Sequence, residues 1–365
     1  MSEPAHSALF EKAINVKALS SNTYEAYLDR AWCIGLVPHG GYTTSILYRT
    51  AALHFKNKSA QPIPPKANPK TRPPEPISLQ ITFLRRTSIG RAVLTVQDIK
   101  LGARISIIHI TLSQPSDTPT KVGRESEREL EVKLAAYITV SPPHAEEGPD
   151  IIGPWGLSPP PPCGSLPDGS VNLSCLGETG NDGSWGRFPT PPRELAAAQH
   201  LELYAPTSTI SPGRSIEDRA NQIVDQWGRF APGGKPARWS NEALVYFLDL
   251  FPAALNRVGA MEESRLRLKS GEVEAEAEGG LGIEITGRFW YPTVTMNVDL
   301  KKRIPKEGVE WLHERVVTRM VRGGRADLDV VMLDAEGGLV ATSSQVALVV
   351  DSARNTKGRG EAGRL

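Results

Sequence analysis

Three polar residues stand where the surrounding sequence is apolar or β-rich, and they are the first candidates for chemistry. Asp249 interrupts an apolar run, Thr293 opens a predicted strand after a Tyr-Pro pair, and Gln345 interrupts the last predicted strand. A carboxylate in apolar surroundings is costly unless it is paired or takes part in proton transfer. For each residue alone an ordinary explanation exists: Asp249 reaches solvent, or Thr293 is a plain β-branched strand residue. The combination of the three favours a site.

A second group precedes a predicted helix near the N-terminus, where His39, Gly40, Gly41 and Tyr42 follow one another. A glycine pair at a helix start lets a ligand approach the exposed backbone N–H groups, which favour an anion or a polarised carbonyl oxygen. The alternative is that both glycines only allow the helix to pack closely on a sheet. Both interpretations stay open, and His39 alone is more typical of a supporting residue than of a base.

The elements that must position the second-half residues are a helix and a set of strands. Apolar residues at helical spacing predict a helix over 241–258 with Asp249 in its middle. Glycine pairs between β-branched runs predict hairpins, and hence an antiparallel four-stranded meander. Its strands are expected at 293–302, 309–321, 326–333 and 339–350. One helix followed by a long meander is the layout of a hotdog unit.

The first half repeats this pattern. Strands are predicted at 21–32, 77–86, 91–101, 105–112 and 130–140, with a helix through 44–55. Residues 77–86 match 293–302 position by position, and the glycine turn and the helix tail keep the same order. We therefore expect an internal duplication and an α+β double hotdog, because one hotdog sheet cannot cover its own open face. The expected domains are an N-terminal repeat 1–140, a Pro/Gly-rich connector 141–192, a C-terminal repeat 193–351 and a disordered tail 352–365.

Within the second repeat, a strand is expected at 200–204 and an insertion at 207–238, with a short helix over 216–230 and a possible role over a pocket entrance. Residues 265–278 are expected to be exposed and 281–289 to form an edge strand. The connector has little periodicity, so it is expected to be extended or partly disordered. Trimming much of 159–182 is accordingly expected to be tolerated.

Composition limits the class of protein. The chain holds 42 Lys and Arg against 41 Asp and Glu, so no global field attracts nucleic acid or an anionic membrane. No run approaches the length of a membrane span, and the N-terminus has no signal-peptide core. Cys33, Cys163 and Cys175 fit no metal motif, so no metal is expected. A reducing cytoplasmic setting is expected, although Gly363-Arg364-Leu365 weakly resembles a peroxisomal signal.

The sequence resembles the TesB-like double-hotdog acyl-CoA thioesterases, and in particular their fungal thioesterase-like branch. The resemblance rests on the helix with Asp249, the strand Pro-Thr-Val-Thr-Met-Asn at 292–297, the last strand Val-Ala-Thr-Ser-Ser-Gln at 340–345, and the Pro-His-Gly-Gly start at 38–41. It implies hydrolysis of an acyl thioester without a cofactor or a covalent intermediate. Asp249 would activate water, and Thr293 and Gln345 would orient it.

The resemblance further implies that backbone N–H groups at the 39–42 helix start, the expected substrate-binding residues, hold the oxyanion. Acyl-CoA or a related thioester is then the expected partner. The sequence does not set the oligomeric state, and a homodimer is one alternative. Bacterial members carry an Asp-His pair where this chain has Thr295-Met296, and an acidic residue where it has Val346. These departures leave two alternatives open. One is a non-hydrolytic hotdog dehydratase, isomerase or cyclase in fungal natural-product biosynthesis, and the other is a non-catalytic acyl-binding protein.

Overall fold

The structure is a computed structural model of the 365-residue chain. It describes residues 8–59, 73–116, 129–151, 153, 155–189, 193–210, 223–250 and 289–356. Within these residues no helix is long and apolar enough to cross a membrane.

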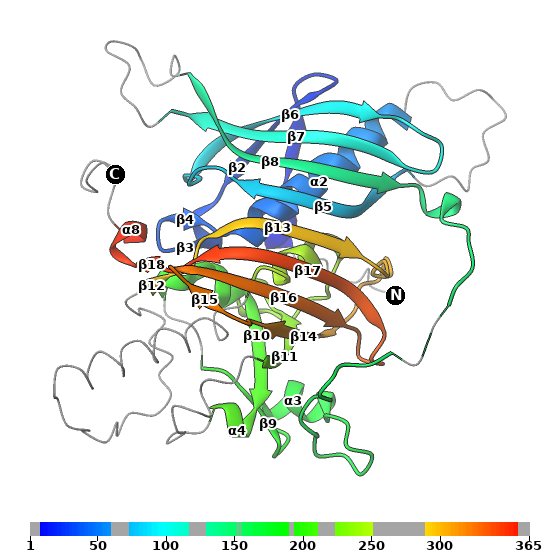
Figure 1. The fold of residues 1–365 in the computed structure, drawn as a ribbon, viewed down its shortest axis with the longest axis vertical. Coiled ribbons are helices and arrows are strands. Elements are labelled where there is room, and N and C mark those ends of the chain that lie inside the picture. Colours follow the sequence, from blue (N-terminus) through cyan, green and yellow to red (C-terminus); the bar gives the residue numbers. More distant parts are fainter. Residues whose placement is uncertain are drawn as a thin grey trace.

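One antiparallel sheet of 14 strands runs through both halves of the described chain (Figure 1). Its order is β1-β2-β6-β7-β8-β5-β13-β17-β16-β14-β11-β10-β9, with β15 paired to β16. The first repeat supplies α1 (Ala8–Ala13), β1 (Val16–Ala18), β2 (Thr23–Leu28), β3 (Cys33–Ile34), β4 (Val37–Pro38), α2 (Gly40–Ser59), β5 (Glu75–Phe83), β6 (Gly90–Lys100), β7 (Ser106–Pro115) and β8 (Leu130–Ser141). The expected helix and strands of this half are therefore present, but the strand expected over 21–32 ends at Leu28, and Arg30–Trp32 form a short 3₁₀ helix capped by Asp29.

The second repeat mirrors this order. It supplies β10 (Leu201–Pro206), α4 (Thr207–Ile210), β11 (Ile223–Phe230), α6 (Asn241–Phe247), β12 (Phe289–Trp290), β13 (Thr293–Leu300), β14 (Trp311–Val317), β15 (Val321–Arg322), β16 (Arg325–Leu333), β17 (Leu339–Leu348), β18 (Val350–Asp351) and α8 (Ala353–Thr356). In both repeats the first long strand described after the helix pairs with the last long strand, as β5 with β8 and β13 with β17. The expectation of a simple four-stranded meander was therefore wrong, because only the last three strands follow one another.

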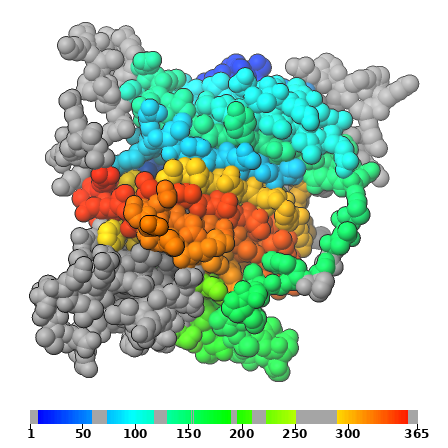
Figure 2. Space-filling model, in the orientation of Figure 1, coloured from blue at the N-terminus to red at the C-terminus, as the bar shows by residue number. Residues whose placement is uncertain are grey.

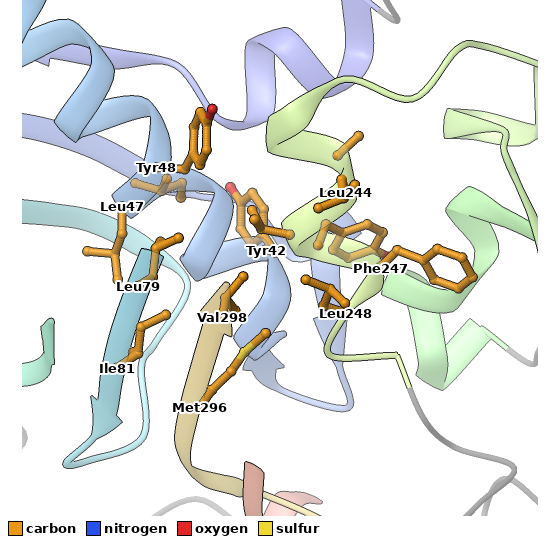
Figure 3. Close-up of a cluster of buried hydrophobic side chains, with 14 of the residues drawn as sticks. Tyr42, Leu47, Tyr48, Leu79, Ile81, Leu244, Phe247, Leu248, Met296 and Val298 are labelled. Atoms are coloured by element: carbon orange, nitrogen blue, oxygen red, sulfur yellow. The ribbon is translucent and has the colours of Figure 1, made fainter. Parts of the chain in front are cut away.

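The two repeats join where β5 pairs with β13. Figure 2 shows this boundary on one face, with the cyan first repeat above the orange and red second repeat. Leu79 and Ile81 face the core from β5, and Met296 and Val298 face it from β13 (Figure 3). The equivalent residues are thus 217 apart (296 − 79 and 298 − 81), not 216 as the position-by-position match supposed. An offset of 216 would match the buried residues of one strand to outward-facing residues of the other, because a shift of one residue turns a strand's side chains to the opposite face.

Two helices cover the inner face of the sheet. α2 packs across β5, β6, β7 and β8 and also against α6. The two helices run antiparallel, because Ser45 Oγ donates to the Glu242 carbonyl while Gly41 lies against the backbone of Tyr246. Tyr42, Leu47, Leu244 and Phe247 meet between them in one continuous apolar core (Figure 3). The site is built at one end of this helix pair.

Several expectations for the second repeat need correction. The 216–230 segment is not a helix in its described part: Ile223–Phe230 forms β11, paired with β14 in the place that β2 takes beside β6. The helix expected over 241–258 ends at Phe247, and Leu248 to Leu250 form its terminal turn. Residues 251–258 and 265–278 lie outside the described residues, as does the expected 281–289 strand except for Phe289.

The connector and the tail carry more structure than expected. α3 (Leu173–Thr179) and β9 (Trp185–Arg187) lie within 141–192, and β9 extends the sheet beside β10. Leu176 and Trp185 are fully buried in a small cluster with Tyr204 and Trp311 of the second repeat. Within the expected tail, Ala353–Thr356 form α8. These short apolar contacts were invisible as periodicity, because each segment is too short to show a pattern.

Candidate active site

A cavity of about 500 Å³ opens where the start of α2, the end of α6 and the start of β13 meet. Four of the candidate residues line it: His39, Gly40, Asp249 and Thr293. Most of the remaining wall is apolar. It includes Ile34, Val37, Phe83, Leu195, Ala198, Leu250, Phe289, Trp290, Tyr291, Val294 and Leu348. Polar residues also line it, among them Arg85, Arg86, Arg354 and Asn355 on the far wall. A mostly apolar cavity with a few polar groups suits a ligand with an apolar chain and polar ends.

Asp249 lies just beyond α6, and only 5% of its surface is exposed. Thr293 Oγ1 donates to Asp249 Oδ1 over 2.9 Å, across two elements 44 residues apart in sequence. The backbone of Gly41 also favours the ionised form of this carboxylate. Burial raises the pKa of Asp249 above its ordinary value, while His39, Thr293 and Gly41 act against that rise. The carboxylate lies at the N-terminus of α2, where the helix dipole favours a negative charge.

His39 stands against the same aspartate. Its Nε2 lies 3.2 Å from the Asp249 carbonyl oxygen and 3.5 Å from Asp249 Oδ2. Both are acceptors, so the ring carries its proton on Nε2. Burial lowers the pKa of His39, although the charge of Asp249 acts the other way. A neutral His39 that donates to Asp249 supports the carboxylate, and its role in substrate binding stays a prediction.

The glycine pair fits closely against the second repeat. A Cβ added at Gly40 would overlap Asp249 Oδ2, and one at Gly41 would overlap the carbonyl of Tyr246. The close-packing explanation is thus correct in kind, but the contact is with the end of α6 instead of with a sheet. The backbone of Gly41 acts on the Asp249 carboxylate, which is a group of the protein and not of a substrate. A role of this helix start in holding the oxyanion therefore stays a prediction.

Gln345 and Tyr42 do not line the cavity within the described part of the chain. Gln345 is buried on β17, and its Nε2 donates to the Leu248 carbonyl over 2.6 Å and to Ser343 Oγ over 3.2 Å. Its amide thus holds the backbone next to Asp249 and is not directed at the carboxylate. Tyr42 is fully buried, and its hydroxyl donates to the Ala13 carbonyl over 2.8 Å.

The far wall of the cavity comes from the end of the second repeat. Arg86 of the first repeat donates through Nη1 to the Arg354 carbonyl over 2.7 Å and through Nη2 to the Asn355 carbonyl over 3.1 Å. Asn355 Nδ2 donates back to the Ile34 carbonyl over 3.0 Å. The Arg86 guanidinium also lies 5.6 Å from the centre of the Trp290 ring. These contacts fix α8 across the repeat boundary, and sequence reasoning gave no sign of them.

Sequence reasoning also missed two buried polar residues behind Asp249. Gln226 on β11 donates through Nε2 to the Leu250 carbonyl over 3.2 Å and to Glu314 Oε2 on β14. Glu314 is fully buried. The only available signal was the alternation of Val224, Gln226 and Phe230 in the segment that had been interpreted as an insertion.

Comparison with known proteins gives the same picture over most of the chain. The model of the acyl-CoA thioesterase N-terminal domain matches residues 28–140, and that of the acyl-CoA thioesterase C-terminal domain matches residues 178–349. The thioesterase-like protein TwmA of Talaromyces wortmannii is 32% identical over 96% of this chain and 94% of its own length. The chain belongs to the TesB-like acyl-CoA thioesterase family. It is therefore an enzyme of the thioesterase class, with the double-hotdog fold expected from its duplication.

Solved structures agree on the fold of this thioesterase. A putative thioesterase II from Thermobifida fusca matches with a TM-score of 0.60 at 18% identity, over 93% of this chain and 98% of that one. A hotdog protein from Alicyclobacillus acidocaldarius matches with a TM-score of 0.60 at 16% identity, over 93% and 97%. The duplicated hotdog framework is thus shared with bacterial proteins of low sequence identity.

Proposed function

We propose that this thioesterase hydrolyses an acyl-CoA, or a related acyl thioester, with Asp249 as the general base for a water molecule. The observation that carries the proposal is the buried Asp249 carboxylate, held by Thr293 at the polar end of an apolar cavity of about 500 Å³. The acyl chain would lie along the apolar wall, and the thioester carbonyl would lie beside Asp249.

The proposed reaction needs no group beyond water. Asp249 takes a proton from the water as its oxygen bonds to the thioester carbon, and the carbonyl oxygen becomes an oxyanion. The oxyanion then collapses, the C–S bond breaks, and the sulfur leaves with the electron pair. Asp249 returns its proton to the thiolate, so the products are the free acid and the thiol. A raised pKa suits the first step, because a more basic carboxylate accepts a proton from the water more readily.

The other polar groups would place the reactants. Thr293 fixes the carboxylate through Oδ1, and His39 fixes it from the Oδ2 side. Gly40 lets Asp249 Oδ2 come close to the start of α2, because a Cβ at this position would overlap that oxygen. Gln345 would act indirectly in this arrangement, by holding the Leu248 carbonyl. Such fixed positioning lowers the entropic cost of the attack.

One observation supports a second candidate. His39 and Asp249 come from different repeats and meet in one site, and a histidine with an aspartate can also remove water from a 3-hydroxyacyl thioester. The orientation argues against it, because Nε2 of His39 carries the proton toward Asp249. The basic Nδ1 is buried and has no hydrogen-bond partner among the described residues. Hydrolysis by Asp249 is therefore the better supported function.

The experiment that tests the proposal is a panel of acyl-CoA esters from short to long chains, with released thiol measured by a colorimetric reagent. The same panel should include a 3-hydroxyacyl-CoA, with absorbance of the enoyl product followed in parallel. Thiol release that disappears in Asp249→Asn supports the proposal. Enoyl formation without thiol release would overturn it in favour of dehydration, and neither signal would favour an acyl-binding protein.

A further inference from the structure

Three consecutive backbone carbonyls, at residues 248–250, are each bound by a side chain from another element. Gln345 of β17 donates to the first, His39 to the second and Gln226 of β11 to the third, over 2.6, 3.2 and 3.2 Å. The last carbonyls of a helix have no partner within the helix, so side chains must supply one. Here the supplied partners surround the residue that carries the proposed base.

Gln226 is itself held by a carboxyl group. Its Nε2 donates to Oε2 of Glu314, its cross-strand neighbour in the β11–β14 pair. Glu314 is fully buried, and no salt bridge to it is found within the described ranges. Its Oε1 has no hydrogen-bond partner there either. An ionised carboxylate without a cation in such a place is very costly, because burial removes its hydration.

The charges around Glu314 point the same way. Asp249 is the charged group whose field reaches it, and its cross-strand neighbours Gln226 and Met332 carry no charge. Burial raises the pKa of Glu314 well above its usual range, the hydrogen bond from Gln226 opposes this, and the negative charge of Asp249 adds to it. Two carboxylates within reach of each other do not both ionise easily. The other ionisable groups that face Asp249 are His39 and Tyr246.

We propose that Gln226 and Glu314 form an uncharged pair that positions the backbone beside Asp249, with the proton kept on Glu314 and the negative charge kept on Asp249. Because Gln226 Nε2 occupies Oε2 of Glu314, the proton belongs on Oε1. The pair touches neither the cavity nor the substrate, so both are positioning residues. This inference rests on the proposed function of Asp249 as the base.

The decisive variant is Glu314→Gln, which keeps the size of the side chain and makes it permanently uncharged. The expected result is a kcat within about threefold of wild type and an acidic limb of the pH–kcat/KM profile that does not move. A shift of that limb toward lower pH by about one unit would mean that an ionised Glu314 had been raising the pKa of Asp249. That outcome would overturn the proposal, as would a large loss of kcat at every pH.

The companion variant is Gln226→Met, which keeps the volume and removes the anchor of the Leu250 carbonyl. We expect kcat to fall by roughly 10- to 100-fold with KM nearly unchanged, because misplaced catalytic groups cost about that much. Gln226→Leu, which also has no donor toward the Leu250 carbonyl, should behave like the methionine variant. Wild-type kcat in both would refute a positioning role for Gln226.

Infrared difference spectroscopy separates a failure of this inference from a failure of the proposed function. The carbonyl band of a protonated carboxyl group should be present in the wild-type protein at neutral pH and absent in Glu314→Gln. If the wild-type chain hydrolyses no thioester but the band is present, the proposed function fails and the proton on Glu314 stands. If hydrolysis is found and the band is missing, only this inference fails.

Discussion

The two repeats share one framework but contribute opposite parts to the site. By the 217-residue spacing of β5 and β13, the position of Thr293 corresponds to Pro76 in the first repeat. β8 and β17 are 207 residues apart, since Lys133 and Val340 accept equivalent backbone bonds, so Gln345 corresponds to Ile138. The first repeat instead supplies the start of α2. Both repeats thus have the same architecture, but only the second carries the threonine and the glutamine.

This difference explains why the proposed site needs both repeats in one chain. The carboxylate and its hydroxyl partner belong to the second repeat, whereas Gly40, Gly41 and His39 belong to the first. A repeat that paired with a copy of itself would bring either the glycine helix start or the aspartate, but not both. The predictions below test this division from the largest expected effect to the smallest.

Asp249→Asn removes the base while keeping the shape, so it tests the contribution of the second repeat most directly. We expect thiol release to fall by about 10²- to 10⁴-fold, the range of general-base catalysis, with binding of a non-hydrolysable thioether analogue nearly unchanged. Glu242→Gln, at the other end of α6, is the matched control and should keep its activity. Full activity in Asp249→Asn would leave the cavity as a binding site and refute the mechanism.

The pH dependence should follow the raised pKa of Asp249. The base acts when ionised, so kcat/KM should fall as pH drops through that pKa, and the acidic limb should lie above the ordinary value of 3.8. A raised folded-state pKa means that the folded protein binds more protons than the unfolded chain in this window. Stability contributed by protonated Asp249 is thus lost as pH rises from about 3.8 through the raised pKa.

Asp249→Asn should therefore unfold at a higher temperature than wild type at neutral pH, and the difference should vanish below the ordinary pKa. Thermal unfolding across a pH series measures this. A lower unfolding temperature for Asp249→Asn at neutral pH would contradict the burial of an unstable charge.

Gly40→Ala tests the contribution of the first repeat. The added methyl would overlap Asp249 Oδ2, so the carboxylate must move, and we expect kcat to fall by roughly 10²-fold. Gly148→Ala is the control, since nothing lies within 4 Å of a Cβ at that position. Equal activity of the two variants would show that the close approach of the repeats is not needed for turnover.

Thr293→Val removes one hydrogen bond to the carboxylate without changing the shape of the residue. Loss of a hydrogen bond to a charged group is expected to lower kcat by about tenfold. Thr293→Ser, which keeps the hydroxyl group, should retain most of the wild-type kcat. Gln345→Ala is expected to cost a similar amount through the Leu248 carbonyl. A loss as large as that of Asp249→Asn in Thr293→Val would make the threonine more than an orienting group.

The connector gives the smallest expected effect on activity. Deleting 173–179 removes Leu176 from its cluster with Trp185 and Trp311 and should lower the free energy of unfolding by about 1.5–3 kcal/mol for that side chain alone. Shortening 145–157 should change stability and turnover little, because long surface loops are tolerated. Because residues 173–179 lie within 159–182, we expect trimming to be tolerated within 145–157 but not across the whole of 159–182. If the two deletion variants had the same free energy of unfolding, the cluster around Leu176 would not contribute to stability as expected.

The sequence by itself determined the repeated elements and the identity of the main polar residues. Alternation along 77–86 and 293–302 marks buried strands, because side chains in a strand alternate between two faces. Asp249 was recognisable because it interrupts an apolar run, whereas Thr293 fits its strand and was identified through the family resemblance. These signals are local, so they survive without knowledge of the fold.

The tertiary structure alone decided how those elements pair and which distant residues meet. Strand order and register depend on contacts between residues 82 to 221 apart in sequence, as in the pairing of β11 with β14 and of β5 with β13. The approach of His39 to Asp249 and the burial of Gln226 with Glu314 depend on the same contacts. A polar residue in a single sequence looks the same whether it faces water or a buried partner, because its cost is set by its partners.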